Sequence, residues 1–432
     1  MAENTFSRLP QELLSFSGRN RIFWRLVMAG TGPMMRLAQW HRATLSRRMR
    51  LVAVIGTYGK TTGTRAVKAA LGLPPKRWTD LNGNCFSLLP LALMRQWPLS
   101  RHGVVEAGIA APGQMQFYAR ALRPDVVIVT SIGEEHIQSF KNIEHLRDEK
   151  AAMVRGLSPQ GTAVLNGDDP HVMWMATQTS ARIVTFGLSP GHDVFATDIA
   201  LDWPEGTRMN LHAFGTSLPL RTHLMGKTML YPLLAAVAAA AAEGRPLAQI
   251  IAGLELLPPT PGRMQAVPLS SGAVILRDEF KATIDTVYAA LDMLQQVPAQ
   301  RRIVAMGDLE SPLNPQRFYY NAVGARICAI ADRAVFIGHS AKNSRWKPCR
   351  SRMGADRVAF TQTWEEALPL LRDQLGPGDV LLVKGAFQQR LTRLAMALAG
   401  ADVQCHVREC GIHLLFCDIC PLLFRRATAC CH

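Results

Sequence analysis

A short apolar run that leads directly into a glycine-rich turn constrains the fold of this chain more than any other feature of its sequence. Residues 51–55 read LVAVI, and residues 56–62 read GTYGKTT. A continuous apolar run of this length predicts a strand buried on both faces of a parallel sheet. A glycine-rich turn between such a strand and a helix directs backbone N–H groups toward an anion. The two segments together therefore predict a phosphate-binding loop.

The residues of this turn are suited to holding a nucleotide such as ATP. Lys60 can reach the β- and γ-phosphates, and the Thr61 hydroxyl can bind Mg²⁺. The other predicted nucleotide-binding positions of the loop are Gly56, Thr57, Gly59 and Thr62. The common GxxxxGK[ST] pattern has a glycine where this chain has Val54, so the loop is shorter than that pattern.

Apolar runs and helix-compatible stretches alternate along the rest of the chain. Runs at 103–106, 125–130, 162–165 and 182–186 predict a central P-loop ATPase domain of the α/β class with a mostly parallel sheet. Residues 192–225 alternate polar and apolar positions, which predicts a small antiparallel section before a helix at 229–242. A turn-rich hinge at 258–262 is followed by apolar runs at 273–276, 302–306, 333–337 and 380–383. These runs predict a smaller, Rossmann-like C-terminal α/β domain.

The predicted organisation has four parts: a basic arm at 1–50, an ATP-binding domain at 51–258, a C-terminal domain at 259–400 and a cysteine-rich tail at 401–432. The arm carries nine arginines against Glu3 and Glu12, which is nearly half of the net charge of +15. Arginines interleaved with apolar residues are typical of amphipathic helices on anionic membrane surfaces. A helix packed on the body with solvated arginines fits the same pattern. No run of about 18 apolar residues is present to span a bilayer.

The GTYGKTT turn resembles that of the Mur ligase superfamily, whose members form amide bonds with ATP, and the resemblance extends over roughly residues 51 to 395. Further segments match in order: NGN at 82–84, VVEAG at 104–108, TSIGEEH at 130–136, RDEKA at 147–151 and LNGDD at 165–169. The resemblance implies that Glu106 and His136 bind metal together with Thr61. Lys150 falls where the family has a lysine that is often carbamylated, and a carbamate would offer two oxygens to a second Mg²⁺.

The resemblance continues beyond the hinge. PGRM at 261–264 resembles a motif that brings an arginine, here Arg263, to the ATP phosphates. RDEFKA at 277–282 resembles a segment whose first aspartate, here Asp278, meets the ribose; MGDLE at 306–310 and VKG at 383–385 also match. Lys60, His136, Lys150 and Arg263 are thus the implied catalytic residues, with Arg263 completing a charge clamp when the domains close.

The chain departs from the family pattern in three places. Only about 50 residues precede the first strand, where ligases acting on UDP-linked muramic acid peptides have an N-terminal nucleotide-sugar domain. We therefore expect that domain to be lacking, as in the membrane-associated poly-γ-glutamate synthetase branch. The helix start at Gly226 lacks both asparagines of the G-x-H-N-x-x-N motif that helps to hold adenine, and KGAF at 384–387 replaces K-G-S-R.

The tail holds six of the nine cysteines. Cys405, Cys410, Cys417 and Cys420 form two pairs whose spacing suits a structural zinc ion, with His406 or His413 as substitutes. The alternative is a set of unpaired thiols. Cysteines scattered through the rest of the chain indicate reduced thiols in a cytoplasmic enzyme.

These features predict an ATP- and Mg²⁺-dependent ligase that joins a small-molecule carboxylate to the amine of an amino acid or peptide through an acyl-phosphate, in cell-wall or poly-amino-acid biosynthesis. One alternative is the ATP-activating subunit of an amidotransferase pair, whose partner delivers ammonia. A second is a non-catalytic ATP-binding module held at a membrane by the basic arm. We expect a cytoplasmic protein with peripheral membrane contact through the arm and with no nucleic-acid partner, since no module for nucleic acid is recognisable.

Overall fold

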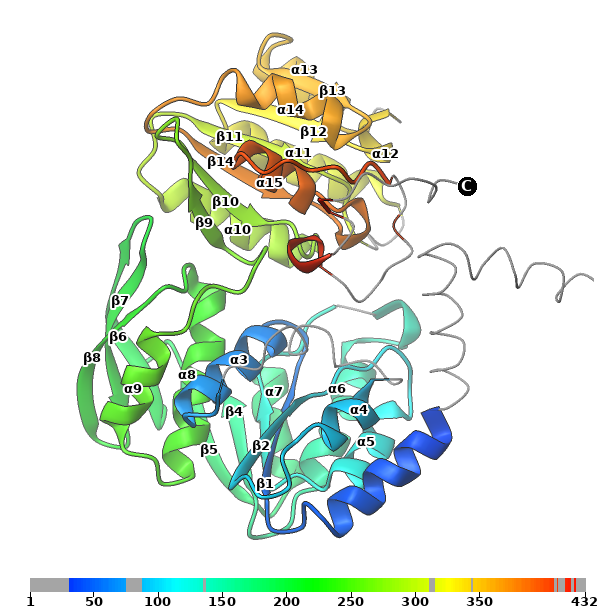
Figure 1. Cartoon of the computed structure of the whole chain (residues 1–432), viewed down its shortest axis with the longest axis vertical. Helices are drawn as coiled ribbons and strands as arrows, with labels where there is room; N and C mark the ends of the chain where they lie inside the picture. Colours follow the sequence, from blue (N-terminus) through cyan, green and yellow to red (C-terminus); the bar gives the residue numbers. More distant parts are fainter. Residues whose placement is uncertain are drawn as a thin grey trace, which may run out of the picture.

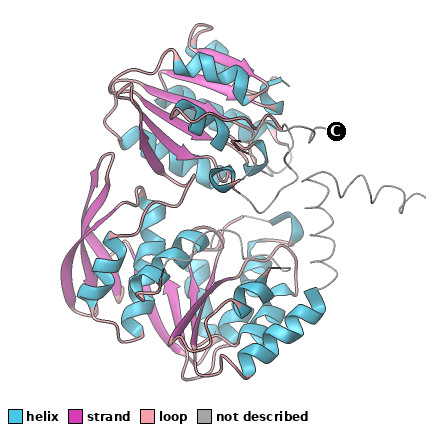
Figure 2. Ribbon diagram, in the orientation of Figure 1, coloured by secondary structure: helices cyan, strands magenta, loops and turns pink. Residues whose placement is uncertain are grey.

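Two α/β units make up the chain (Figure 1). The computed structural model describes residues 31–74, 88–134, 137–310, 315–342, 345–407, 410, 416–420 and 423–424. The first unit is built on an eight-stranded sheet and the second on a six-stranded sheet, and in each the strands lie between helices (Figure 2). The predicted α/β class, with a mostly parallel first sheet and a smaller second unit, is confirmed.

The first sheet has the strand order β2-β1-β3-β4-β5-β6-β7-β8. Its strands are β1 (Arg50–Ile55), β2 (His102–Glu106), β3 (Val126–Val129), β4 (Thr162–Asn166), β5 (Arg182–Gly187), β6 (Val194–Asp202), β7 (Gly206–Ala213) and β8 (Thr216–Thr222). Pairing is parallel from β2 to β6 and antiparallel from β6 to β8. The antiparallel section lies within the 192–225 segment where alternation predicted it.

Helices cover both faces of the parallel part of this sheet, which is why β1 is apolar from Leu51 to Ile55. Val52 and Val54 face the core under α3 (Lys60–Ala70), α8 (Lys227–Ala242) and α9 (Leu247–Glu255). Leu51, Ala53 and Ile55 face the opposite core, as the two-residue period of a strand requires. That core lies under α4 (Leu89–Met94), α5 (Gln114–Leu122), α6 (Ile143–Arg155) and α7 (Pro170–Trp174), and two short 3₁₀ turns, η1 (Ile137–Ser139) and η2 (Met175–Gln178), lie on the same stretch of chain.

The second sheet has the order β13-β12-β11-β14-β10-β9, and all its pairings are parallel except that of β9 with β10. Its strands are β9 (Gln265–Pro268), β10 (Val274–Asp278), β11 (Arg302–Met306), β12 (Arg333–Ile337), β13 (Val358–Thr361) and β14 (Val380–Lys384). The helical segments are α10 (Ile284–Gln296), α11 (Arg317–Ile330), α12 (His339–Lys342), α13 (Lys347–Met353), α14 (Trp364–Arg372), η3 (Phe387–Gln389), α15 (Thr392–Leu398) and η4 (Cys417–Ile419). Apolar cores on its two faces make it a second packed unit.

The described part of the basic arm packs on the first unit. A helix over residues 31–43 buries Met35 and Ala38 in the same core as α4 and α5. For residues 31–49, the alternative of a helix packed on the body is therefore the observed one, whereas residues 1–30 lie outside the described residues. No helix in the described part of the chain is long and apolar enough to span a bilayer.

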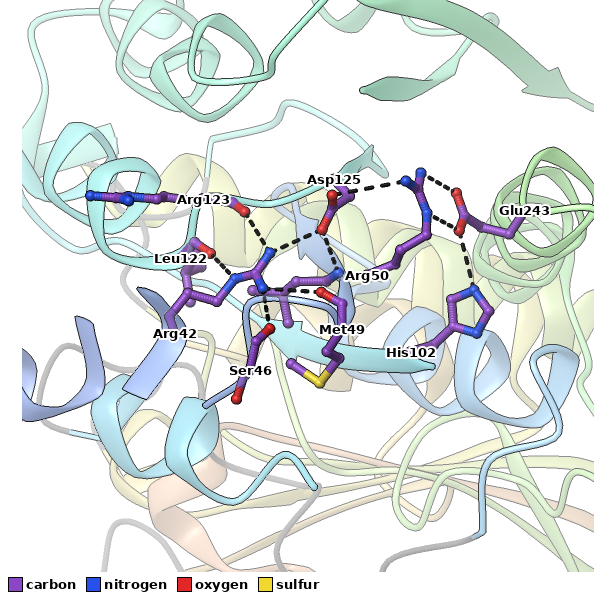
Figure 3. A network of polar contacts seen from close by, with 10 residues as sticks. Arg42, Ser46, Met49, Arg50, His102, Leu122, Arg123, Asp125 and Glu243 are labelled. Carbon is purple, nitrogen blue, oxygen red and sulfur yellow. Dashed lines mark hydrogen bonds and ion pairs between the residues drawn. The ribbon is translucent and has the colours of Figure 1, made fainter. Parts of the chain in front are cut away.

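Arg42 anchors this segment to the edge of the sheet (Figure 3). Its guanidinium makes five hydrogen bonds of 2.6 to 3.0 Å, one for each of its N–H groups, to the main-chain oxygens of Ser46, Met49, Leu122 and Arg123 and to the Asp125 carboxylate. Asp125 also accepts the main-chain N–H of Leu51 at 2.8 Å. The arm thus packs against the start of β1, which lies six residues before the glycine-rich turn.

A second ion-pair group lies beside it in Figure 3. Glu243, just after α8, accepts hydrogen bonds from Nε and Nη2 of Arg50, on one edge of the guanidinium, and contacts His102 at 3.1 Å. Burial alone would raise the pKa of Glu243, but the hydrogen bonds from His102 and Arg50 outweigh it and lower the pKa to about 2. This group ties the starts of β1 and β2 to the end of α8.

Candidate active site

The predicted phosphate loop lies between the end of β1 and the start of α3. Gly59 adopts a left-handed backbone with φ of 79°, and a Cβ there would lie 2.7 Å from Pro232 of α8. Only glycine fits both the conformation and the space. Thr130, after β3, fixes the loop from the other side by donating to the main-chain oxygen of Tyr58 at 2.5 Å. The loop is therefore held by two neighbouring elements as well as by its own sequence.

Two buried lysines converge on Thr57 in this loop. The Lys60 ammonium donates to the Thr57 main-chain oxygen at 2.8 Å, and the Lys150 ammonium, from α6, donates to the Thr57 hydroxyl at 2.8 Å. Both lysines are at least nine-tenths buried. Two cations beside the N-terminus of α3 make this corner of the molecule strongly attractive to a phosphate group.

Two of the four predicted metal ligands, Thr61 and Glu106, meet at the start of α3. The Thr61 hydroxyl donates to Glu106 Oε1 at 3.3 Å, and Glu106 stands at the end of β2, which pairs directly with β1. A hydroxyl and a carboxylate are oxygen donors of the kind that Mg²⁺ uses alongside phosphate oxygens, so the donor set fits this ion. His136 lies outside the described residues. Within the described ranges, no three or more His, Cys, Asp or Glu side chains are grouped to hold a metal ion.

Arg263 reaches the same threonine from beyond the hinge. Its Nη2 donates to Thr61 Oγ1 at 3.2 Å, and its guanidinium carbon lies 4.2 Å from the centre of the Phe280 ring. Two further contacts join the units here: Tyr58 donates to Asp285 of α10 at 2.8 Å, and Arg65 donates to Thr260 at 2.6 Å. The structure thus brings Lys60, Thr61, Glu106 and Arg263 together around one loop.

Asp278, predicted to meet the ribose, is engaged inside the second unit. Its Oδ2 accepts from the Lys384 ammonium at 2.5 Å and its Oδ1 from the Met264 N–H at 3.0 Å. Burial raises the pKa of Asp278, although the charge of Lys384 acts in the opposite direction. In this structure Asp278 orders the segment that carries Arg263, and a ribose contact stays a prediction.

Sequence reasoning missed a polar cluster on α8. Tyr231 donates to Asp168 Oδ2 at 3.1 Å, and His192 contacts Asp168 Oδ1 at 3.1 Å. Burial and the nearby Asp168 charge raise the pKa of Tyr231 to about 12, so its hydroxyl remains protonated as the donor. Tyr231 belongs to the helix start that lacks both asparagines of the family motif. The missing asparagines were the one sign in the sequence that a different polar side chain stands at this helix start.

The structure does not support the predicted zinc site. Cys417 packs in the core of the second unit, with Cys405 and Cys420 against that core, and none of the four predicted zinc ligands forms a disulfide. Burial raises the pKa of Cys417 to about 12, against the opposing charges of Arg390 and Arg393. Among the described residues, no three or more His, Cys, Asp or Glu side chains are grouped to hold a metal ion, so the spacing of these cysteines does not come with a zinc site there.

Two family models match the chain over most of its length. The Mur ligase middle domain matches residues 54–240, and the Mur ligase glutamate ligase domain matches residues 262–387. The matches begin after the basic arm and cover the glycine-rich turn, Glu106, Lys150 and Arg263.

Relatives of similar sequence are ligases. The UDP-N-acetylmuramoyl-tripeptide–D-alanyl-D-alanine ligase of Mycobacterium tuberculosis is 28% identical over 388 residues, covering 83% of this chain and 74% of that protein. The enzyme of the same name from Bacillus subtilis is 24% identical over 359 residues, covering 81% and 76%.

Solved structures agree with these matches. A crystal structure of MurF from Acinetobacter baumannii has a TM-score of 0.75 at 25% identity, covering 86% of this chain and 81% of that one. The MurF ligase of Thermotoga maritima, solved with ADP, shares the fold with a TM-score of 0.72 at 18% identity, covering 86% and 83%. From the two matched domains and the ligases that share them, the chain belongs to the Mur ligase family of ATP-dependent acid–amino acid ligases.

Proposed function

We propose that this ligase joins a peptide carboxylate to an amine through an acyl-phosphate. The carboxylate oxygen attacks the γ-phosphorus of ATP, so that ADP leaves and an acyl-phosphate forms. The amine then attacks the carbonyl carbon, loses a proton, and expels inorganic phosphate as the tetrahedral intermediate collapses. Such chemistry depends mainly on positioning and on neutralising the charge of the phosphates.

The observation that carries the proposal is the environment of Thr61. Its hydroxyl lies 3.3 Å from a carboxylate of the first unit and 3.2 Å from a guanidinium of the second. Lys60 and Arg263 supply positive charge from opposite sides of the loop. A preorganised pair of cations of this kind stabilises charge on the transferring phosphoryl group without reorganisation.

Thr61 and Glu106 are the residues that would hold Mg²⁺, which neutralises charge on the ATP phosphates when bound. The proposed roles of His136 and of a carbamylated Lys150 at a second metal position rest on the family resemblance. Lys150 donates to the Thr57 hydroxyl here, and this contact holds its side-chain nitrogen at the floor of the loop.

For the substrates, the names of the relatives suggest the first compounds to test. We propose a dipeptide of the D-alanyl-D-alanine class as the amine and a peptide of the muramoyl-tripeptide class as the carboxylate donor, which would place the enzyme in cell-wall biosynthesis. The donor is to be tested both with and without its UDP group.

The test is phosphate release and product mass with purified protein and Mg-ATP. Turnover is expected only when both D-alanyl-D-alanine and a muramoyl-tripeptide, with or without UDP, are present. Lys60→Ala should lower the rate at least about 100-fold, whereas Arg120→Ala, an exposed residue of α5, should leave it unchanged. Equal rates in wild type and Lys60→Ala would overturn the proposal.

The same assay separates the alternatives. Stimulation by ammonia alone would favour an ATP-activating subunit that works with a partner. A non-catalytic ATP-binding module is set aside by membership in a family of ligases.

We further propose that the exposed face of the arm contacts an anionic lipid surface. Residues 31–50 contain no acidic residue, and Leu37, Trp40 and Leu45 are each more than half exposed. The exposed arginines among them are Arg36, Arg47 and Arg48. Trp97 and Leu99 are also exposed, and the chain near them is joined to the end of the arm by the hydrogen bond from the Arg50 N–H to the Arg101 oxygen. Aromatic and aliphatic side chains among arginines suit an anionic bilayer interface.

Vesicle flotation tests this contact. The protein should float with vesicles that contain phosphatidylglycerol but not with pure phosphatidylcholine, and Trp40→Ala combined with Leu37→Ser should weaken the binding several-fold. Binding that ignores both the lipid charge and these substitutions would refute it.

A further inference from the structure

The described residues of the cysteine-rich tail, which the family match does not cover, pack on the second unit. Val403, Cys417 and Leu423 are buried in the core under α15, and Phe416 is also buried. Arg393 of α15 donates to the Val407 oxygen at 2.6 Å, and the Gln404 N–H bonds to the Leu423 oxygen at 2.8 Å. In Figure 1 the red turn of the tail lies at the side of the second unit that faces the first.

Phe416 of the tail completes a cluster of three rings. Its ring is stacked on Phe280, with centroids 5.0 Å apart and planes at 26°, and Phe387 contacts both rings. Phe280 is also the ring over which the Arg263 guanidinium lies, at 4.2 Å. Ring pairs and cation–ring contacts both favour this arrangement. Phe416 is therefore one ring away from the arginine that reaches the phosphate loop.

Asp418 makes a second connection to the same turn. Arg277, at the end of β10, pairs with Asp418 at 2.8 Å and with Glu279 at 2.6 Å. Glu279 lies against Gly262, where an added Cβ would be 3.2 Å from its carboxylate, and the Phe280 N–H bonds to the Gly262 oxygen at 3.2 Å. The tail thus contacts Arg277 and Phe280. These residues, with Glu279, pack against the turn before Arg263.

We propose that the tail is part of the nucleotide site and that Phe416 and Asp418 are positioning residues for Arg263. The tail fixes Phe280 and Arg277, these fix the 261–264 turn, and the turn directs Arg263 to Thr61 and the phosphates of ATP. The inference rests on the proposed function only in that Arg263 serves those phosphates. Removing a tail contact should therefore weaken ATP binding and slow turnover only by displacing Arg263.

The experiment compares Mg-ATP affinity and turnover in tail variants of the full chain. Phe416→Ala should lower both kcat and the affinity for a fluorescent ATP analogue, with a combined loss of about 10- to 100-fold, because small displacements of a positioned group have effects of this size. Phe416→Tyr should keep most of the activity, and Asp418→Asn should give a smaller loss than Phe416→Ala. Phe424→Ala is the matched control, since this tail phenylalanine is 57% exposed.

A double-mutant cycle distinguishes positioning from general destabilisation. In an Arg263→Ala background, Phe416→Ala should add less than about a twofold further loss, because the arginine that it positions is already gone. Two results would overturn the inference. One is that Phe416→Ala causes as large a loss in the Arg263→Ala background as in wild type. The other is that Phe416→Ala and Phe424→Ala bind the ATP analogue with equal affinity. Because ATP affinity is measured without co-substrates, the outcome is readable even if no ligation product is found.

Discussion

Replacing Arg42 with methionine should destabilise the first unit more than removal of any solvated arginine of the arm. Methionine keeps much of the aliphatic stem but removes all five hydrogen bonds. Four main-chain oxygens that now accept N–H groups of Arg42 lose this partner, and Asp125 loses its contact at 3.0 Å. Arg42 itself is only 7% exposed, so water has little access to its position.

The magnitude follows from these contacts. A buried polar group left without its partner costs about 1 to 3 kcal/mol, and breaking a buried ion pair costs about 3 to 5 kcal/mol. Asp125 is about one-third exposed and keeps the Leu51 N–H, so solvent screening reduces its share. We expect a loss of at least about 3 kcal/mol, which lowers the Tm of a unit of this size by at least roughly 6 °C.

Urea unfolding followed by tryptophan fluorescence, together with a thermal melt, measures this loss. Arg42→Lys should recover little of it, because an ammonium cannot supply five donors in a planar fork. Arg36→Ala, an exposed arginine on the same helix, should change stability by no more than about 0.5 kcal/mol. A loss below about 1 kcal/mol in Arg42→Met, or full recovery with lysine, would refute the reasoning.

Three further predictions concern other polar contacts. The pKa of Glu243 is lowered to about 2 in the folded chain, so the ionised carboxylate stabilises the folded state by about 3 kcal/mol at most. This stabilisation should be complete above pH about 4.5 and disappear as the pH falls toward 2. The urea midpoints of wild type and Glu243→Gln should therefore converge in acid. Lys384→Met should lower the free energy of unfolding by about 3 to 5 kcal/mol, because it leaves Asp278 buried without its cation. Adding Asp278→Leu should recover most of that loss in the same unfolding assay. No recovery would argue against the ion pair. Thr57→Val should lower ligase turnover about 10- to 100-fold by removing the acceptor of the Lys150 ammonium, while Thr216→Val, on an exposed position of β8, should have no effect on the rate.

The sequence by itself determined where the main strands and helices lie and in which order the two α/β domains follow along the chain. LVAVI, GTYGKTT and the following helix lie within about 20 residues, and apolar periodicity and turn chemistry are both local properties. For the same reason the parallel strands, the antiparallel section after residue 192 and the α/β class were predictable. The family resemblance added Glu106 and Arg263, and the structure places both within 3.3 Å of Thr61.

Only the tertiary structure decided which distant residues meet. Asp278 pairs with Lys384 because β10 and β14 are neighbours in the sheet, and Arg42 finds Leu122 and Asp125 because the arm packs at the start of β1. Strand order and packing depend on the whole chain, so no local pattern encodes them. The zinc prediction rested on cysteine spacing, which is a local property, whereas packing places Cys417 in the core of the second unit, and no three His, Cys, Asp or Glu side chains of the described residues are grouped to hold a metal ion.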